Sequence, residues 1–494
     1  SAFSLTGASF QDSLFAKTLI SGHGIIASTT SSNAPAFNTM LFAEKSASAL
    51  TQISANAFSA TTSGQNSAAF QFSMRGNGQA SNLLKIDGSN AAISTQGHGA
   101  FGLSSLVSSG TGAASQHLQF AGNNLSINTR GDQAYGMHAA TLSQANASNR
   151  ATVEGSNASI TTDGQESTAM SLWSVSQASA NNEITLAGGY ARVATVGEGS
   201  HAIASIASGV AGSSNQLNIS GHSAAISTRA DKAIGYLSLV SDLTHADSRF
   251  AMTGANSKIE TAGTSAHGIL ALTTGNWASS DLLVTGAGSR ISTRGNNAIG
   301  VSSIALGTER GASFLRLLGT NILIETDGTF STGAYLGSSG TLEATNRATI
   351  NGQLSRIVTR GDNSSGITFA GPLSELSLIG NGAGVFTFGA DSHGILFDST
   401  LSTVFVGTGA AIKATGPNSD GIFIKPSSSS ASIQNIGHIY GQRNGINSAG
   451  AISALNYGRV TGMTGSGMVF DHGYIFNTGR ILGPAALVAR PGHA

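Results

Sequence analysis

The chain has 494 residues, no cysteine, and 24 basic and 24 acidic residues, so its formal net charge is zero with histidine neutral. Zero net charge excludes the positive surface expected of a protein that binds nucleic acid or binds membranes through a polybasic segment. No apolar run is long enough to cross a bilayer. Glycine is abundant at 65 residues and only 10% of residues are charged, but aliphatic residues recur at fixed intervals, which a disordered chain does not show.

Residues 1–26 precede the clear repeat, and we expect them to form an N-terminal cap or first turn. From residue 27 a pattern recurs in which an aliphatic or small residue is followed two positions later by threonine and then by a glycine-containing turn, with degenerate copies at Ala27 and Ala60. Successive copies are about 33 residues apart, a period found in repeat architectures. The nine clear anchor residues are Ile93, Ile127, Ile160, Val193, Ile226, Ile259, Ile291, Ile324 and Ile357.

Small residues keep the same period as the anchors. Glycine stands five residues before each anchor, as Gly122 does before Ile127, and glycine or alanine stands nine residues after it, as at Gly136. Glycine recurs where the backbone needs a positive φ or must approach another backbone closely. Between these positions apolar and polar residues alternate with a period of two, which predicts strands rather than helices, three in each repeat.

The repeat then shortens toward the C-terminus. Wide repeats cover 27–384, and intermediate repeats with anchors Val385 and Ile412 cover 385–431. The intermediate repeats have about 28 and about 27 residues, which is still within the range of solenoid repeats. In 432–494 the segments IQNIGHIYG, ALNYGRVTG and IFNTGRILG place Asn435, Asn456 and Asn477 at intervals of 21 residues.

One fold explains these observations: an all-β, single, right-handed parallel β-helix with three strands per turn, narrowing from about 33 to about 21 residues per turn. Equivalent residues of successive turns then stack about 4.8 Å apart, and parallel crossovers are nearly always right-handed. The anchors become an internal aliphatic ladder, and the glycine and asparagine columns mark corners. A helical solenoid of the same period is excluded, because the repeats are rich in Gly, Ser, Thr and β-branched residues.

Turns rich in Ser, Thr, Asn and Gly, the absence of cysteine, and the C-terminal N-x-G-x-I-x-G units together resemble the passenger domain of a bacterial autotransporter (type V secretion) of the pertactin-like kind. The lack of cysteine fits export through an oxidising space. The resemblance implies a virulence-associated protein on the bacterial surface, or secreted through the outer membrane, that acts in adhesion or binds host proteins. It also implies membrane attachment only through a translocator barrel that is not part of this chain.

The tripeptide Arg-Gly-Asp occurs twice, as Arg130, Gly131 and Asp132 and as Arg360, Gly361 and Asp362, each time directly after an anchor threonine. Some passengers of the resembled kind carry repeated copies of this tripeptide. As binding residues they would engage a host receptor from an exposed turn. As turn residues they need no partner, because glycine flanked by polar residues is typical of any exposed turn.

Catalytic, cofactor and metal sites are not expected. GDNSSG at 361–366 falls on an ordinary turn, and FQDSLF, with Gln11, Asp12, Ser13 and Leu14, lacks the glycine of a lipase-type motif. There is no zinc-binding pattern. Four histidines are interpreted as exposed turn residues: His98, His201, His267 and His393. The carboxylates that a β-helix sugar-cleaving enzyme would use are scattered, at Asp163, Glu198, Asp231, Glu260 and Asp327.

Two further features bear on partners. Ser227, Thr228, Ser292 and Thr293 are expected to face outward in hydroxyl columns, which would suit contacts with a partner or simple solubility. Trp173 and Trp277 are either packing residues or surface aromatics at a contact.

The leading hypothesis for function is a non-enzymatic adhesin or binder of a host cell-surface or serum protein. The alternative is a self-associating structural element of aggregates, biofilm or a filament. A polysaccharide-processing β-helix enzyme is third. No nucleic-acid partner is expected under any of them.

Overall fold

The computed structural model describes residues 3–9, 13–426 and 430–490, and these ranges contain strands and no helix. None of the described segments is therefore a helix suited to crossing a membrane. The chain divides into two compact units, Ser1–Thr261 (unit 1) and Ala262–Ala494 (unit 2). Both are built in the same way.

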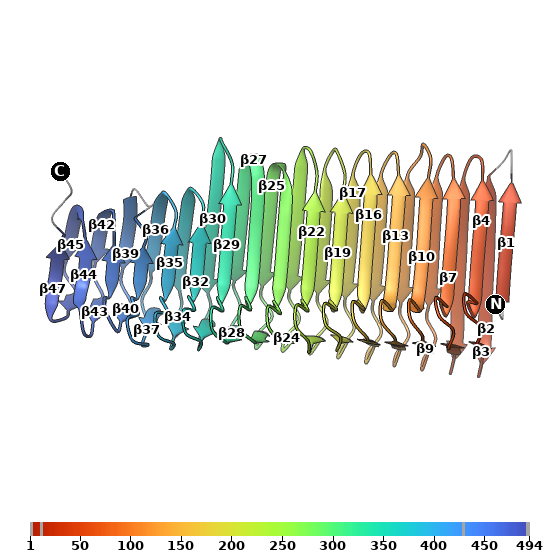
Figure 1. Ribbon diagram of the computed structural model, residues 1–494, viewed down its shortest axis with the longest axis horizontal. Helices are drawn as coiled ribbons and strands as arrows, with labels where there is room; N and C mark the ends of the chain where they lie inside the picture. The colour runs from red at the N-terminus through yellow and green to blue at the C-terminus, as the bar shows by residue number, and fades with distance from the viewer. Residues whose placement is uncertain (1–2, 10–12, 427–429, 491–494) are drawn as a thin grey trace. The chain divides into compact units, whose positions relative to one another are not determined.

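Unit 1 is a coil in which each turn contributes three strands. One turn contains β9 (Ala92–Gln96), β10 (Phe101–Ser109) and β11 (Ala114–Phe120), and the next contains β12 (Ser126–Arg130), β13 (Tyr135–Ser143) and β14 (Ala147–Val153). Each strand pairs in parallel with its equivalent in the next turn, as the repeated arrows of Figure 1 show. This confirms the predicted parallel β-helix and its wide turns of about 33 residues.

The interior of the coil is aliphatic at the anchor positions. Within unit 1, Ile127 lies opposite Ile93 on one side and Ile160 on the other. All nine anchors are at most 1% exposed. β-branched side chains suit this position because they pack well on a pleated surface, and burying each one contributes about 1.5–3 kcal/mol.

A ladder of amide side chains also lies inside unit 1. It runs through Gln116, Asn149, Asn182 on β17 (Ala180–Leu186) and Asn215 on β20 (Ser213–Ile219). Each amide nitrogen donates to the amide oxygen of the next turn, at 2.6, 2.9 and 3.0 Å in that order. This ladder was not among the features predicted from the sequence.

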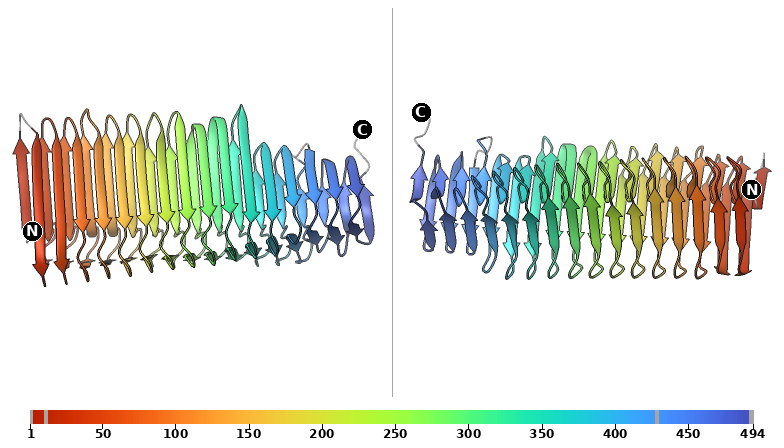
Figure 2. Two further views of the ribbon diagram at one scale, coloured as in Figure 1. Left: turned by 180° about the vertical axis from the view of Figure 1, so that it is seen from behind. Right: turned by 60° about the horizontal axis from the view of Figure 1, so that its bottom comes forward.

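Unit 2 begins with turns of the same width and then narrows. The anchor register runs from Ile324 to Ile357, Val385, Ile412 and Ile439. The spacing of equivalent residues falls along this series from 33 to 28 and then to 27 residues. The register continues to Val460 and Ile481 at intervals of 21. Figure 2 shows the blue strands to be shorter than the green strands of the same unit.

The first narrowing step occurs at one corner. β29 (Ala334–Ser339) pairs with β32 (Ile367–Ala370), and β30 (Glu343–Asn351) pairs with β33 (Leu373–Ile379). Seven residues, 338–344, separate the paired segments in one turn, and only two, 371–372, separate them in the next. The five-residue difference lies at the corner and at the facing ends of the second and third strands, so the rest of each strand keeps its register.

Regularly spaced asparagines stack in the narrow turns of unit 2. The side-chain nitrogen of Asn435 donates to Oδ1 of Asn456 (2.8 Å), and that of Asn456 donates to Oδ1 of Asn477 (2.6 Å). Asn435 and Asn456 are fully buried, so the amide ladder of unit 1 has a counterpart in unit 2.

Candidate functional site

The first Arg-Gly-Asp tripeptide forms the corner after β12. Arg130 ends that strand, and Gly131 has φ of +128°. A Cβ atom on Gly131 would overlap the carbonyl oxygen of Gly97 in the preceding turn. Oδ1 of Asp132 accepts a hydrogen bond from the backbone N–H of Gln165 in the following turn (2.8 Å). Gly131 thus allows the backbones of two turns to approach closely, and Asp132 bonds its turn to the next one.

The second tripeptide, in unit 2, has the same arrangement. A Cβ atom on Gly361 would overlap the carbonyl oxygen of Gly328, and Oδ1 of Asp362 accepts from the backbone N–H of Ala390 (2.7 Å). Arg360 is held by ion pairs with Glu325 and with Asp327 (3.1 Å). This arginine is therefore less available to a partner than Arg130, which has no ion pair within the described residues.

A turn without the tripeptide shows that its aspartate position has a general role. In the turn Arg294, Gly295, Asn296, Oδ1 of Asn296 accepts from the backbone N–H of Thr329 (3.0 Å), as Asp132 does from Gln165. The third residue of the turn thus caps the next turn whether it is Asp or Asn. These contacts support the turn interpretation of the tripeptides, and receptor binding by them stays a prediction.

The expectation of exposed turn histidines is wrong for three of the four. His98 is exposed, but His201, His267 and His393 are only partly exposed. In each of these three, Nδ1 accepts a backbone N–H of the following turn, from Ile234, Ile299 and Asp420 at 3.2, 3.0 and 3.2 Å. Burial lowers the pKa of all three rings. The neutral form of each ring therefore provides the acceptor that bonds its turn to the next one.

Two of the four hydroxyls expected to face outward do not. Thr228 is 1% exposed and Thr293 is fully buried. Side chains two residues apart on a strand share a face, so Thr228 lies on the inner face with Ile226, and Thr293 lies there with Ile291. Ser227 does face outward, whereas Ser292 is covered at 4% exposed.

The residues considered for catalysis are not assembled into a site. Ser364 of GDNSSG is fully buried, and its hydroxyl donates to the carbonyl oxygens of Gly328 (3.1 Å) and Asp362 (3.0 Å). In FQDSLF, Gln11 and Asp12 lie outside the described residues. Glu198 pairs with Lys232, and Glu260 with Lys258, both at 3.0 Å. The described residues contain no group of three or more His, Asp or Glu side chains suited to a metal ion.

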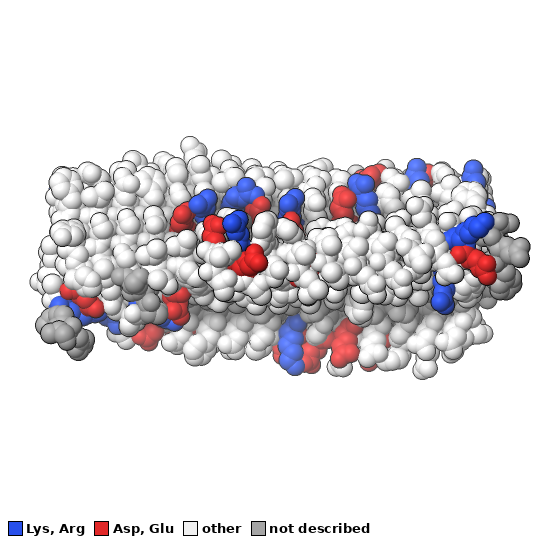
Figure 3. Space-filling view, turned by 90° about the horizontal axis from the view of Figure 1, so that it is seen from above, with Lys and Arg blue, Asp and Glu red and all other residues white. Residues whose placement is uncertain are grey.

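Charged side chains elsewhere are mostly found in mixed groups. In unit 2, Arg347 pairs with Glu375 of the next turn (2.6 Å), and Arg316 pairs with Asp281. Basic and acidic residues accordingly lie side by side on the face shown in Figure 3, separated by uncharged areas. That face presents no extended surface of one sign.

Trp277 lies on the outside of unit 2, on β25 (Ile269–Val284), and is 43% exposed. Its indole N–H donates to Glu309 (3.0 Å), and the guanidinium of Arg310 lies over the ring, 5.2 Å from its centroid. The ring therefore belongs to a local polar cluster on β27 (Val301–Leu317).

The outer side of β10, β13 and β16 (Met170–Ser176) in unit 1 carries exposed apolar and aromatic side chains, which we name the outer apolar face. Leu106, Leu142, Trp173 and Val175 are 41–45% exposed. The face consists of Phe101, Leu106, Tyr135, His138, Leu142, Trp173 and Val175.

Ring contacts order one end of this face. The rings of Phe101 and Tyr135 stack with centroids 5.3 Å apart, and the ring of His138 meets that of Trp173 edge-on at 5.8 Å. Burial among these side chains lowers the pKa of His138 to about 4. His138 is thus an uncharged member of the face at neutral pH.

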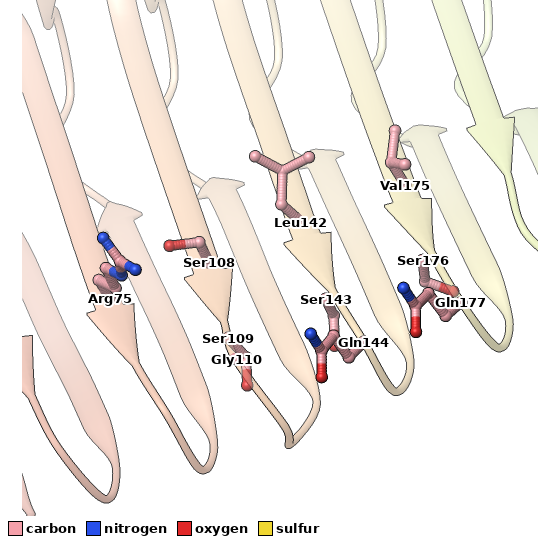
Figure 4. A pocket seen from close by; sticks show the side chains of 10 residues that line it. All are labelled: Arg75, Ser108, Ser109, Gly110, Leu142, Ser143, Gln144, Val175, Ser176 and Gln177. Atoms are coloured by element: carbon pink, nitrogen blue, oxygen red, sulfur yellow. The ribbon is translucent and has the colours of Figure 1, made fainter.

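A hollow of about 450 Å³ lies at the other end of the face, where the strands run into their corners. Figure 4 shows Leu142 and Val175 on neighbouring strands, with Gln144 and Gln177 beyond them in the corners. Arg75 lies in the same row as Leu142, on the other side of Ser108. Of this face, sequence reasoning singled out only Trp173, as either a packing residue or a surface aromatic, and the ring is 42% exposed. The signal for the whole face was the recurrence of Leu, Trp and Val at outward positions of the second strands.

No family model, curated protein or solved structure matched this chain in the three comparisons made.

Proposed function

We propose that this chain is a non-enzymatic binding protein of the bacterial surface, the passenger domain of a pertactin-like autotransporter, and that it acts as an adhesin toward a host cell-surface or serum component. The parallel β-solenoid, the lack of cysteine and the repeat pattern support the class. A stacked coil whose side chains face outward in fixed columns suits a binding role, because it holds a surface rigidly.

The observation that carries the proposal is the outer apolar face of unit 1. Contiguous exposed apolar side chains are rare on the surface of a soluble protein and commonly mark interaction sites. The face is built on β10, β13 and β16, whose backbones pair with a neighbour on each side. The side chains are therefore presented on a rigid surface, which limits the entropy lost on binding.

The two tripeptides support the proposal less well. One carboxylate oxygen of each aspartate is bonded to the backbone of the next turn, and Arg360 is ion-paired. A receptor would have to compete with these contacts. We therefore assign binding to the outer apolar face.

Capture from human serum and from a cell-surface extract tests this assignment. The wild-type protein is compared with a face variant, Leu142→Ser with Trp173→Ser, and with a tripeptide variant, Asp132→Ala with Asp362→Ala. We expect the captured component, identified by mass spectrometry, to be lost with the face variant and retained with the tripeptide variant. The opposite result would move the site to the tripeptides. Capture by none of the three would refute the adhesin role, and sedimentation at rising concentration would then test self-association.

A further inference from the structure

We propose that the hollow beside Arg75 binds an acidic saccharide chain, with a carboxylate of the sugar against the Arg75 guanidinium and the sugar rings over Leu142 and Val175. The inference deepens the proposed function, on which it rests, by naming the chemical class of the ligand.

The charge of the hollow selects an anion. Arg75, on β7 (Phe70–Gly76), is the only charged residue among those that line the hollow. It is exposed and has no ion pair within the described part of the chain. A guanidinium presents a planar fork of N–H donors that matches a carboxylate. A ligand that brings a carboxylate would supply the missing counter-charge.

The lining repeats along the coil. Arg75, Ser108, Leu142 and Val175 occupy one row of the strand register, so neighbouring members are about 4.8 Å apart. Gln144 and Gln177 follow Leu142 and Val175 by two residues each, which adds a parallel row of amides. Such a lining suits a ligand that itself repeats, as a polymer does.

The first row presents the apolar side chains of Leu142 and Val175, and the second row presents the amides of Gln144 and Gln177. A sugar ring likewise has an apolar face and a polar edge. Its C–H face packs on aliphatic side chains, while its hydroxyls at the ring edge both donate and accept hydrogen bonds. The side-chain amides of Gln144 and Gln177 do the same. Both glutamines are exposed and make no side-chain hydrogen bond within the described ranges. Their amides are therefore available to the hydroxyls of a ligand.

A peptide fits this position less well. Extended peptides bind sheets by adding a strand to an open edge, where backbone groups are unpaired. The hollow lies on the face of a sheet whose strands β10 and β13 are paired on both sides. Apart from Gly110 it is lined by residues with side chains and offers no open strand edge, which favours a saccharide over a peptide.

Calorimetric titration of the full chain tests the inference with three probes: a linear galacturonic acid oligomer, the same oligomer with its carboxyl groups reduced to alcohols, and a polyglutamate of similar length. We expect the first to bind and the other two to bind about tenfold more weakly or not at all, since a charge-assisted hydrogen bond and the ring contacts are each required. Arg75→Gln should weaken binding of the acidic oligomer by about tenfold or more. Leu142→Asn should weaken it as well.

Arg130→Gln is the matched control, because Arg130 is also an exposed arginine of unit 1 but does not line the hollow. Equal loss with Arg130→Gln, equal binding of the reduced oligomer, or Arg75-dependent binding of polyglutamate would each overturn the inference, as would no binding of the acidic oligomer. If host-component capture persists in Arg75→Gln while the oligomer fails to bind, the proposed function stands and only the ligand class is wrong.

Discussion

Replacing Asn182 by alanine removes the central member of the amide ladder inside unit 1. Oδ1 of Asn182 accepts from Nδ2 of Asn149 (2.9 Å) and from the hydroxyl of Ser174 (2.8 Å). Its Nδ2 donates to Oδ1 of Asn215 (3.0 Å) and to the carbonyl oxygen of Ile206 (2.8 Å), and makes a longer bond to the carbonyl oxygen of Leu172 (3.3 Å). The side chain is 2% exposed, so water cannot replace these partners without entering the coil.

The expected cost follows from the four shorter bonds. A buried hydrogen bond between neutral groups contributes about 1 kcal/mol net, so Asn182→Ala should lower the free energy of local unfolding by about 4 kcal/mol. Each step of about 1.4 kcal/mol is a factor of ten, which gives roughly a thousandfold rise in the opening equilibrium of the turns around β17.

Native-state hydrogen exchange measures this change strand by strand. In a solenoid each turn contacts only its neighbours, so the loss of protection should centre on β14, β17 and β20 and fade within a few turns. Asn181→Ala is the control, because Asn181 is the adjacent residue on the outer side of β17 and its side chain accepts one bond, from the hydroxyl of Ser214 (2.7 Å). We expect the control to cost less than about 1 kcal/mol. Equal protection in the two variants would refute the reasoning that the ladder stabilises the coil.

Two more predictions concern unit 1. Ile226→Asp should unfold the turns around β21 (Ala225–Thr228), because a buried unpaired carboxylate costs several kcal/mol. Ser227→Asp, on the outer side of the same strand, should have the melting temperature of the wild type. Equal melting temperatures of the two variants would show that the anchor column is not internal. Burial lowers the pKa of His201, so the stability from its neutral ring is complete above the unfolded value of about 6.5 and is lost as the pH falls below it. His201→Gln should therefore reduce the fall in melting temperature between about pH 7.5 and pH 5; a fall as large as that of the wild type would contradict the role assigned to Nδ1.

The fold could be predicted because in a solenoid the period of the sequence is the period of the contacts. Ile127 and Ile160 stand one repeat apart in the sequence and lie directly opposite each other in the sheet. The register therefore followed from the spacing of one residue type, and the narrowing followed from the shortening of that spacing.

The amide ladder could not be inferred with the same ease. Gln116, Asn149, Asn182 and Asn215 also recur at intervals of 33 residues, yet an amide in the interior is acceptable only if its partners are present. Those partners are backbone carbonyls and hydroxyls of other strands, such as the carbonyl of Ile206 and the hydroxyl of Ser174. Their positions are known only once all three strands of each turn are placed.

The candidate site shows a different limit. Strand alternation tells which residues face outward, but not which outward residues of different turns come together. Leu142 and Val175 become one surface with Arg75 only through the register of β7, β10, β13 and β16. The histidines were misjudged for a related reason, because the N–H groups that His201 and its equivalents accept from belong to the next turn.

The corner at 371–372 in unit 2 has a practical consequence. Five residues disappear there relative to 338–344, while the paired residues on either side stay in register. The coil can therefore shorten a turn at a corner and at the strand ends beside it, with the loss of a core position such as Ala344, while the remaining strand residues stay paired. Such a corner is a natural position for grafting a foreign loop, and it would let binding specificity diversify on an unchanged scaffold.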